Sequence, residues 1–125
     1  MTLAATAVNR SDAMKRIDAV IRQENLEIVR ERLNDIGVEG LTATEVIGYG
    51  RQKGHTETYR GCEYRVDFHA KMLLTIIARD DHVEQILDAI VDGARTGKIG
   101  DGKIFVTSVE EVVRIRTGEI GKAAV

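Results

Sequence analysis

The sequence predicts an α+β domain with the ferredoxin-like element order β-α-β-β-α-β, a short extra strand at its C-terminal end and one long connecting loop. Two segments with apolar residues at helical spacing alternate with strand-like segments in that order. At 125 residues with 43% hydrophobic content, the chain has apolar material for one core, and a second domain is not expected.

The first half of the chain predicts a strand, a helix and a second strand. In "KRIDAVI", the residues Ile17, Ala19 and Ile21 recur at period two, as in a strand with one buried face. Asn25 then offers a capping side chain, and Gly37 offers a left-handed helix end. The helical stripe between them consists of Leu26, Val29, Leu33 and Ile36. The threonine- and valine-rich "LTATEVIGYG" predicts the second strand.

Residues 50–67 show no periodicity and are longer than a hairpin connection needs, so they are expected to form a long flexible loop. The run "KMLLTIIA" that follows is apolar on both faces, which favours a central strand. Asp80 and Asp81 are expected to cap a helix. Its apolar stripe contains Val83, Ile86, Leu87 and Ile90. The segments "KIFVTSV" and "VVRIRT" predict the last strands.

Charge and cysteine content exclude several classes of function. The 18 basic and 20 acidic residues leave a net charge of -2, so no global field favours nucleic acid or an anionic membrane. One cysteine, Cys62, excludes an intramolecular disulfide and a multi-thiolate metal site. Residues 1–13 resemble neither a secretory signal nor a membrane span. We expect a poorly ordered leader over 1–13, a single domain over 14–125, no membrane insertion and a cytoplasmic protein.

The stretch "RTGKIGDGKIFV" suggests a local anion site. Glycine lets a backbone approach phosphate closely, and lysine or arginine neutralises its charge. The stretch is not a Walker A loop, because Gly93 and Gly97 are one residue too close and Ile99 stands where a Ser or Thr would bind a metal. The segment "GYGRQKG" also misses the dinucleotide-binding spacing.

A pair of arginines near the C-terminus strengthens the anion hypothesis. Period-two alternation in "VVRIRT" places Arg114 and Arg116 on one face of the expected strand. Arg95, Lys98 and Lys103 precede them. A solvated basic surface beside a turn explains the same composition, and pattern alone leaves both interpretations open.

These residues also resemble a known family. "TGKIGDGKIFV", "VVRIRTGE" and "GYGRQKGHTETYRGCEYRVDF" are similar to the signature segments of the PII nitrogen-regulatory signal-transduction proteins, over about 14–119. The resemblance implies a ferredoxin-like protomer in a homotrimer, with ATP or ADP bound between subunits. Such proteins sense the adenylate ratio and 2-oxoglutarate, and move a long loop against target proteins.

The resemblance assigns site residues by position. It places the polyphosphate on a loop from Thr96 to Lys103, with Arg114 and Arg116 reaching it from a neighbouring subunit. The implied nucleotide-binding set is Thr42, Arg51, Gln52, Thr96, Gly97, Lys98, Ile99, Gly100, Asp101, Gly102, Lys103, Arg114 and Arg116. Thr42 is expected by the adenine and Arg51 by the phosphates.

A second set of residues is implied for the effector. Gln52 would ligate, through its carbonyl, a Mg2+ ion shared by ATP and 2-oxoglutarate, and Lys71 would pair with the distal carboxylate of the effector. The implied effector-binding set is Gln52, Lys53, Gly54 and Lys71. A hard cation shared by both ligands makes each affinity depend on the other.

Other positions match the family in part. Tyr64 stands where many bacterial relatives are uridylylated or adenylylated, and Cys62 where some carry a phosphorylated serine. The segment "RQE", 22–24, replaces a Lys-Pro-Phe run and removes a lysine and an aromatic residue near the effector pocket. Thr75 replaces a glutamate near the adenine. Both departures bear on ligand affinity or selectivity.

Two alternatives to a 2-oxoglutarate sensor stay open. One is a nucleotide sensor of the same fold that answers to another small anion such as bicarbonate; the other is an ATP-hydrolysing enzyme. No nucleophile with a paired base is visible, so we do not expect an enzyme. His55, His69 and His82 lack metal-ligand spacing and are interpreted as loop or surface residues. Expected partners are protein targets such as an ammonium channel, a biosynthetic enzyme or a nucleotidyltransferase, and no nucleic acid.

Overall fold

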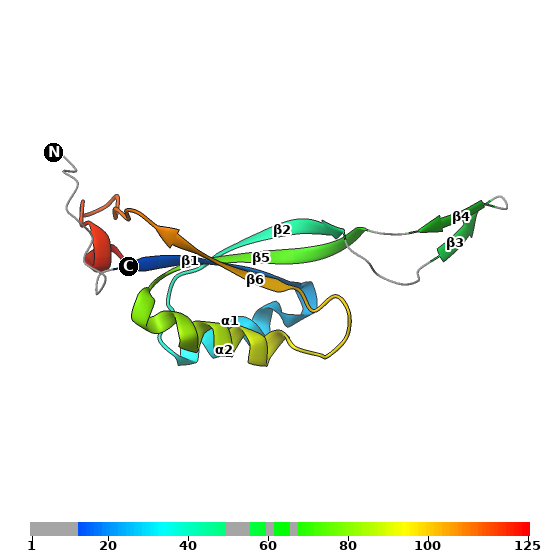
Figure 1. The fold of residues 1–125 in the computed structure, drawn as a ribbon, viewed down its shortest axis with the longest axis horizontal. Coiled ribbons are helices and arrows are strands. Elements are labelled where there is room, and N and C mark those ends of the chain that lie inside the picture. The colour runs from blue at the N-terminus through cyan, green and yellow to red at the C-terminus, as the bar shows by residue number, and fades with distance from the viewer. Residues whose placement is uncertain (1–12, 50–55, 60–61, 66–67) are drawn as a thin grey trace.

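The computed structural model describes residues 13–49, 56–59, 62–65 and 68–125. It contains a four-stranded antiparallel sheet in the order β2-β5-β1-β6, with helices α1 and α2 on one of its faces (Figure 1). The first and third strands of the β-α-β-β-α-β order therefore lie in the middle of the sheet, as the ferredoxin-like arrangement requires. The predicted fold class is confirmed.

The four strands begin and end close to their expected positions. They are β1 (Met14–Arg22), β2 (Thr42–Tyr49), β5 (Phe68–Arg79) and β6 (Lys103–Val109). The β5 strand, predicted to be central from its apolar run, pairs with β1 and with β2. Ala19 lies opposite both Leu74 and Ile104, so these three side chains share one face of the sheet.

The two helices bury the stripes that the sequence predicts. They are α1 (Leu26–Asp35) and α2 (Val83–Ala94). Val29 and Leu33 from α1 and Ile86 and Ile90 from α2 are buried against the inner face of the sheet. The described helices include none that is both long and apolar enough to pass through a membrane.

Both expected side-chain caps are wrong. A 3-10 turn precedes each helix, η2 (Gln23–Asn25) before α1 and η3 (Asp80–His82) before α2. A side chain caps a helix from a residue with an extended backbone, but here the residue before each helix belongs to the 3-10 turn and has a helical backbone. Asn25 instead donates to the carbonyl of Ala94, and Asp81 pairs with Arg79. The expected end of α1 is confirmed, because Gly37 is left-handed at φ 91°.

The outer face of the sheet carries apolar side chains that the two helices do not cover. Alternation places Val20 of β1, Leu73 of β5 and Phe105 of β6 on this face, opposite the core. Phe105 is 53% exposed. An antiparallel sheet with one solvated face normally presents polar residues there. The apolar side chains among the polar ones on this face favour burial against another surface.

Part of the expected loop forms a hairpin. Strands β3 (Thr56–Tyr59) and β4 (Cys62–Arg65) pair antiparallel in a separate two-stranded sheet. Each strand has four residues, too few for periodicity to show against the polar composition of the segment.

The extra C-terminal strand is absent from the described residues, so that expectation is wrong. Val113 makes one isolated bridge to Ile120, and residues 115–117 form a turn. The reason is local: Gly118, at φ 72°, lets the chain fold back, so that the amide of Arg114 donates to the carbonyl of Glu119. A short 3-10 helix, η4 (Gly121–Ala124), follows.

Candidate functional site

The phosphate loop, which we define as residues 96–102, connects α2 to β6. Gly97, Gly100 and Gly102 adopt φ values of 84°, 103° and 105°, a conformation that residues with a side chain rarely adopt. Gly102 also lies against the backbone of β1, where an added Cβ would stand 2.8 Å from the carbonyl carbon of Val20. Conformation therefore favours glycine at all three positions, and space requires it at Gly102 as well.

Asp101 closes the phosphate loop on itself. Its carboxylate accepts from the amides of Thr96 at 2.8 Å and Gly97 at 2.9 Å, and also from the hydroxyl of Thr96. The hydroxyl bond, with the amide bonds and Arg22, holds the pKa of Asp101 at about 2, below its ordinary 3.8. A carboxylate bound by several donors strongly prefers its charged form.

This network predicts an acid-sensitive loop. Since the folded pKa of Asp101 lies below the unfolded value, its contribution to stability is complete above about pH 4 and is lost between about pH 4 and 2. The melting temperature of the wild type should therefore approach that of Asp101→Asn as the pH falls from 6 to 3. A constant difference between the two melting curves across this range would contradict the expectation.

Several amides of the loop are left for a ligand. Among the described residues, the backbone N–H groups of Ile99, Gly100, Asp101 and Gly102 have no hydrogen-bond acceptor. Ile99 is 67% exposed, and Lys98 beside it is also exposed. Consecutive amides in a turn with left-handed glycines form a concave anion-binding site.

Lys71 reaches the phosphate loop from the sheet. Its side chain is buried, its Nζ donates to the carbonyl of Gly100, and the absence of a side chain at Gly48 leaves room for its aliphatic stem. Burial, with Arg22 nearby, lowers the pKa of Lys71, and the carboxylates of Glu24 and Asp101 oppose this shift. The predicted effector residue and the predicted phosphate loop are thus in contact.

Arg22 brings a cation to the phosphate loop. The "RQE" segment lacks the lysine of the family pattern, but its arginine contacts the loop. Its Nη2 donates to the carbonyl of Ile99 at 2.8 Å, and its Nε lies 3.5 Å from the carboxylate of Asp101. The alternation along β1 predicts on which face of the sheet Arg22 lies. Nothing in the sequence shows that the phosphate loop contacts this residue.

Arg114 and Arg116 lie far from the phosphate loop of the same chain. Lys103 begins β6 beside Val20, whereas Val109 ends it beside Met14, and both arginines follow at that opposite end of the sheet (Figure 1). Arg114 pairs with Glu119 at 3.1 Å. One protomer therefore does not bring the predicted cations together.

Thr42 and Thr75 lie opposite each other on the outer face of β2 and β5. Thr75 donates to Asp18 at 2.7 Å, and Arg16 also binds that carboxylate. Burial raises the pKa of Asp18, but the hydrogen bonds from Thr75 and Arg16 outweigh it and hold the pKa below its ordinary value. Thr75 thus belongs to a polar cluster with Asp18 and Arg16 in which its hydroxyl has a hydrogen-bond partner.

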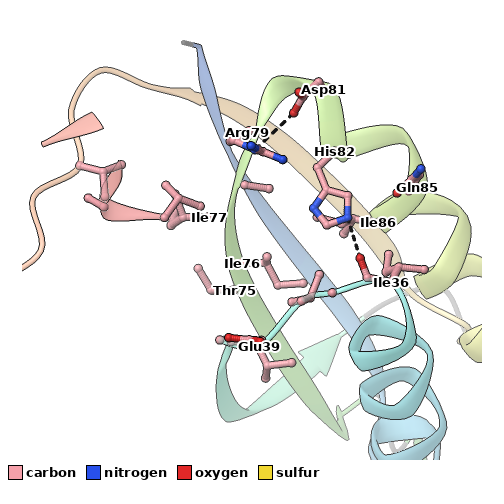
Figure 2. Close-up of a pocket in the computed structure, with 18 of the residues that line it drawn as sticks. Ile36, Glu39, Thr75, Ile76, Ile77, Arg79, Asp81, His82, Gln85 and Ile86 are labelled. Atoms are coloured by element: carbon pink, nitrogen blue, oxygen red, sulfur yellow. Dashed lines mark hydrogen bonds and ion pairs between the residues drawn. The ribbon is translucent and has the colours of Figure 1, made fainter. Parts of the chain in front are cut away.

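A cavity of about 980 Å³ begins at these threonines. It lies between β5, the connection from α1 to β2, the start of α2 and the C-terminal residues (Figure 2). His82 and Ile36 meet across it, with Nε2 of His82 3.0 Å from the carbonyl of Ile36. Its volume suits a small organic ligand.

The histidines differ from their interpretation as loop or surface residues. His69 lies in β5, and its Nε2 is buried with no hydrogen-bond partner in the described residues. His82 is partly buried and joins η3 to the end of α1. His55 falls outside the described residues.

Several expected site residues cannot be placed. Arg51, Gln52, Lys53 and Gly54 fall outside the described residues, and Tyr64 lies in β4. The described part of the chain contains no group of three or more His, Cys, Asp or Glu residues able to hold a metal ion.

Fold and loop together define a ferredoxin-like domain that presents, at one end of its sheet, a glycine-rich loop with backbone amides that are free among the described residues. The family model described as Nitrogen regulatory protein P-II matches residues 14–119. The P-II proteins of Pasteurella multocida and Azospirillum brasilense are 56% and 55% identical to the chain over 112 residues, 90% of the chain and 100% of each relative. The chain belongs to the nitrogen regulatory protein P-II family.

Solved structures agree with this assignment. Arabidopsis thaliana PII bound to citrate is 38% identical, with a TM-score of 0.74, and the match covers 90% of this chain and 92% of that one. A GlnK-ATP complex from B. subtilis is 30% identical, with a TM-score of 0.76 and coverage of 92% and 98%.

Proposed function

We propose that the protein is a signal-transduction regulator that binds ATP or ADP between the subunits of a homotrimer. The observation that carries the proposal is the phosphate loop, whose left-handed glycines leave four backbone amides without a partner in the described residues. The ATP complex of the related GlnK supports the choice of ligand. The implied nucleotide residues of this loop run from Thr96 to Lys103.

The dimensions of the sheet suit an extended nucleotide. Lys71, beside the phosphate loop, and Thr75, beside the cavity, are four residues apart on one face of β5, about 13 Å at the usual strand rise. We place the adenine near Thr42 and Thr75 and the phosphates at the loop. Arg51 and Gln52 complete this site in the proposal.

Two features support a homotrimer. The exposed apolar side chains on the outer face of the sheet favour cover, and the Arg114 and Arg116 side chains are too far from the loop of their own chain to neutralise a phosphate there. A neighbouring subunit provides both the cover and the second set of cations. Guanidinium groups suit this role because they bind phosphate oxygens in a fixed, bidentate geometry.

The proposed effector is 2-oxoglutarate, bound with Mg2+ by Gln52, Lys53, Gly54 and Lys71. Mg2+ at nucleotide sites takes most of its ligands from phosphates and water, so the lack of an acidic cluster among the described residues fits it. Lys71 supplies the charge for a carboxylate. The distal carboxylate must then compete with the carbonyl of Gly100, which Lys71 already binds.

A second candidate effector is a smaller anion such as bicarbonate. The observation that favours it is Glu24, whose negative charge acts on Lys71 and would repel the second carboxylate of a dicarboxylate. Titrating 2-oxoglutarate and bicarbonate in parallel into the Mg-ATP form separates the two effectors.

The remaining assignments concern the output of the regulator. We propose that residues 50–67 contact target proteins, such as an ammonium channel, a biosynthetic enzyme or a nucleotidyltransferase, in the cytoplasm. Tyr64 in β4 is the proposed modification site. A regulatory rather than enzymatic role is in keeping with the family, and any ATP hydrolysis should stay at the level of a side reaction.

Isothermal titration tests the proposal directly. ATP and ADP should each bind, and 2-oxoglutarate should bind when Mg-ATP is present and not without it. A trimeric mass in solution is expected as well. A protein that binds no adenine nucleotide would end the proposal.

Replacing Arg114 by alanine tests the intersubunit site. Losing a charge-assisted contact to phosphate should weaken ATP binding by about 1–3 kcal/mol, with the trimer intact. Glu119→Gln is the matched control, because it removes the local partner of Arg114 and leaves the guanidinium in place. ATP affinity in Arg114→Ala equal to that of the wild type would show that this arginine does not contact the nucleotide.

A further inference from the structure

We propose that Arg22 is a positioning residue of the phosphate loop, which fixes the loop for a polyphosphate without touching the ligand. This inference rests on the proposed nucleotide function. Arg22 links β1 to the phosphate loop: it ends β1, donates to the carbonyl of Ile99, and lies beside the carboxylate of Asp101 that organises Thr96 and Gly97.

The anchor of Arg22 is rigid. Its backbone pairs with Lys71 of β5 in the middle of the sheet, so the guanidinium starts from a fixed strand. About a quarter of the side chain is exposed, as is about a quarter of Asp101. The planar guanidinium serves two acceptors at once, which a lysine ammonium on a flexible stem does less well.

Arg22 of β1 and Lys71 of β5 orient consecutive peptide groups of the loop. Arg22 binds the carbonyl of Ile99, and Lys71 binds the carbonyl of Gly100. In a trans peptide the C=O and the following N–H point in opposite directions. Holding these two oxygens toward the sheet therefore turns the N–H groups of Gly100 and Asp101 away from Arg22 and Lys71. The same contacts keep the carbonyl oxygens from facing a phosphate.

Charge reinforces this arrangement. The pKa of Lys71 is lowered by burial and by Arg22, and the nearby carboxylates of Asp101 and Glu24 compensate the two cations. Removing Arg22 leaves Asp101 with its loop donors but without a tie to the sheet. Ile99 and Asp101 then lose their link to β1, which loosens the turn that Asp101 forms with Thr96 and Gly97, while Lys71 still binds Gly100 and Lys103 still pairs with Val20.

Nucleotide titration of Arg22→Gln, Arg22→Lys and the control Lys15→Gln tests the proposal. Lys15 lies on the same strand and donates to Ser108, away from the loop. Arg22→Gln should raise the ATP dissociation constant about tenfold, Arg22→Lys should recover part of that loss, and Lys15→Gln should change it less than about twofold. Equal ATP affinity in Arg22→Gln and the wild type would overturn the inference.

A double-mutant cycle separates positioning from direct contact. If Arg22 acts through Asp101, the losses of Arg22→Gln and Asp101→Asn should not add in the double variant. Additive losses would show that Arg22 does not act through Asp101 and would overturn the positioning role proposed here.

Amide hydrogen exchange measures how well the loop is ordered in the absence of nucleotide. Arg22→Gln should speed the exchange of the Thr96 and Gly97 amides about tenfold while leaving α1 unchanged. Unchanged exchange at these amides contradicts the inference. If the wild type binds no nucleotide but Arg22→Gln still shows this faster exchange, the proposed function fails and the loop anchor stands.

Discussion

Replacing Gly102 by alanine should destabilise the protein by about 2–4 kcal/mol and weaken nucleotide binding at least about tenfold. The φ value of 105° is strained for any residue with a side chain, and the new Cβ would overlap the carbonyl oxygen of Val20. Since Lys103 pairs with Val20 immediately afterwards, the loop cannot move away without disturbing the start of β6.

Gly97→Ala is the matched control. It has a φ value of 84° in the same loop, but an added Cβ would meet no atom within 4 Å. Only the backbone strain applies there, so the expected cost is about 1–2 kcal/mol. Urea unfolding and ATP titration of both variants measure the difference. Equal losses would show that close packing against β1 does not matter.

Patterns that repeat along the chain made the fold predictable. Alternation in β1 and the helical stripes of Val29 with Leu33 and of Ile86 with Ile90 each report a buried face, and burial is what holds these elements in place. The composition of the loop suggested an anion site, because glycines beside lysines suit phosphate, but the spacing matched neither standard motif and only the family resemblance assigned the loop. These features depend on residues close together in the sequence.

Features that depend on distant or competing contacts were not predictable. Arg22 and the carbonyl of Ile99 are 77 positions apart, and alternation cannot show that the loop returns to β1. "VVRIRT" alternates like a strand, yet the turn at Gly118 satisfies the amide of Arg114 locally. The two helix caps failed for a similar reason, since a 3-10 turn displaced the capping residue.

Leu74→Ala should lower the free energy of unfolding by about 2–5 kcal/mol, because it empties space at a fully buried position of β5. Leu73, its neighbour in the same strand, points to the outer face instead. In an isolated protomer, Leu73→Ala should cost much less, since part of that side chain is exposed.

The same pair of variants bears on the proposed trimer. If subunits meet through the outer face, Leu73→Ala should weaken assembly, and its melting temperature should depend more on protein concentration than that of the wild type. Leu74→Ala should instead lower the melting temperature by a similar amount at every concentration. Sedimentation and thermal melts over a hundredfold range of concentration distinguish these outcomes, and a Leu73→Ala protein with wild-type assembly would exclude this face from the interface. Leu74 is buried under the helices, whereas Leu73, the adjacent residue of β5, faces the outer side of the sheet. The two variants therefore test burial inside the protomer and burial between subunits separately.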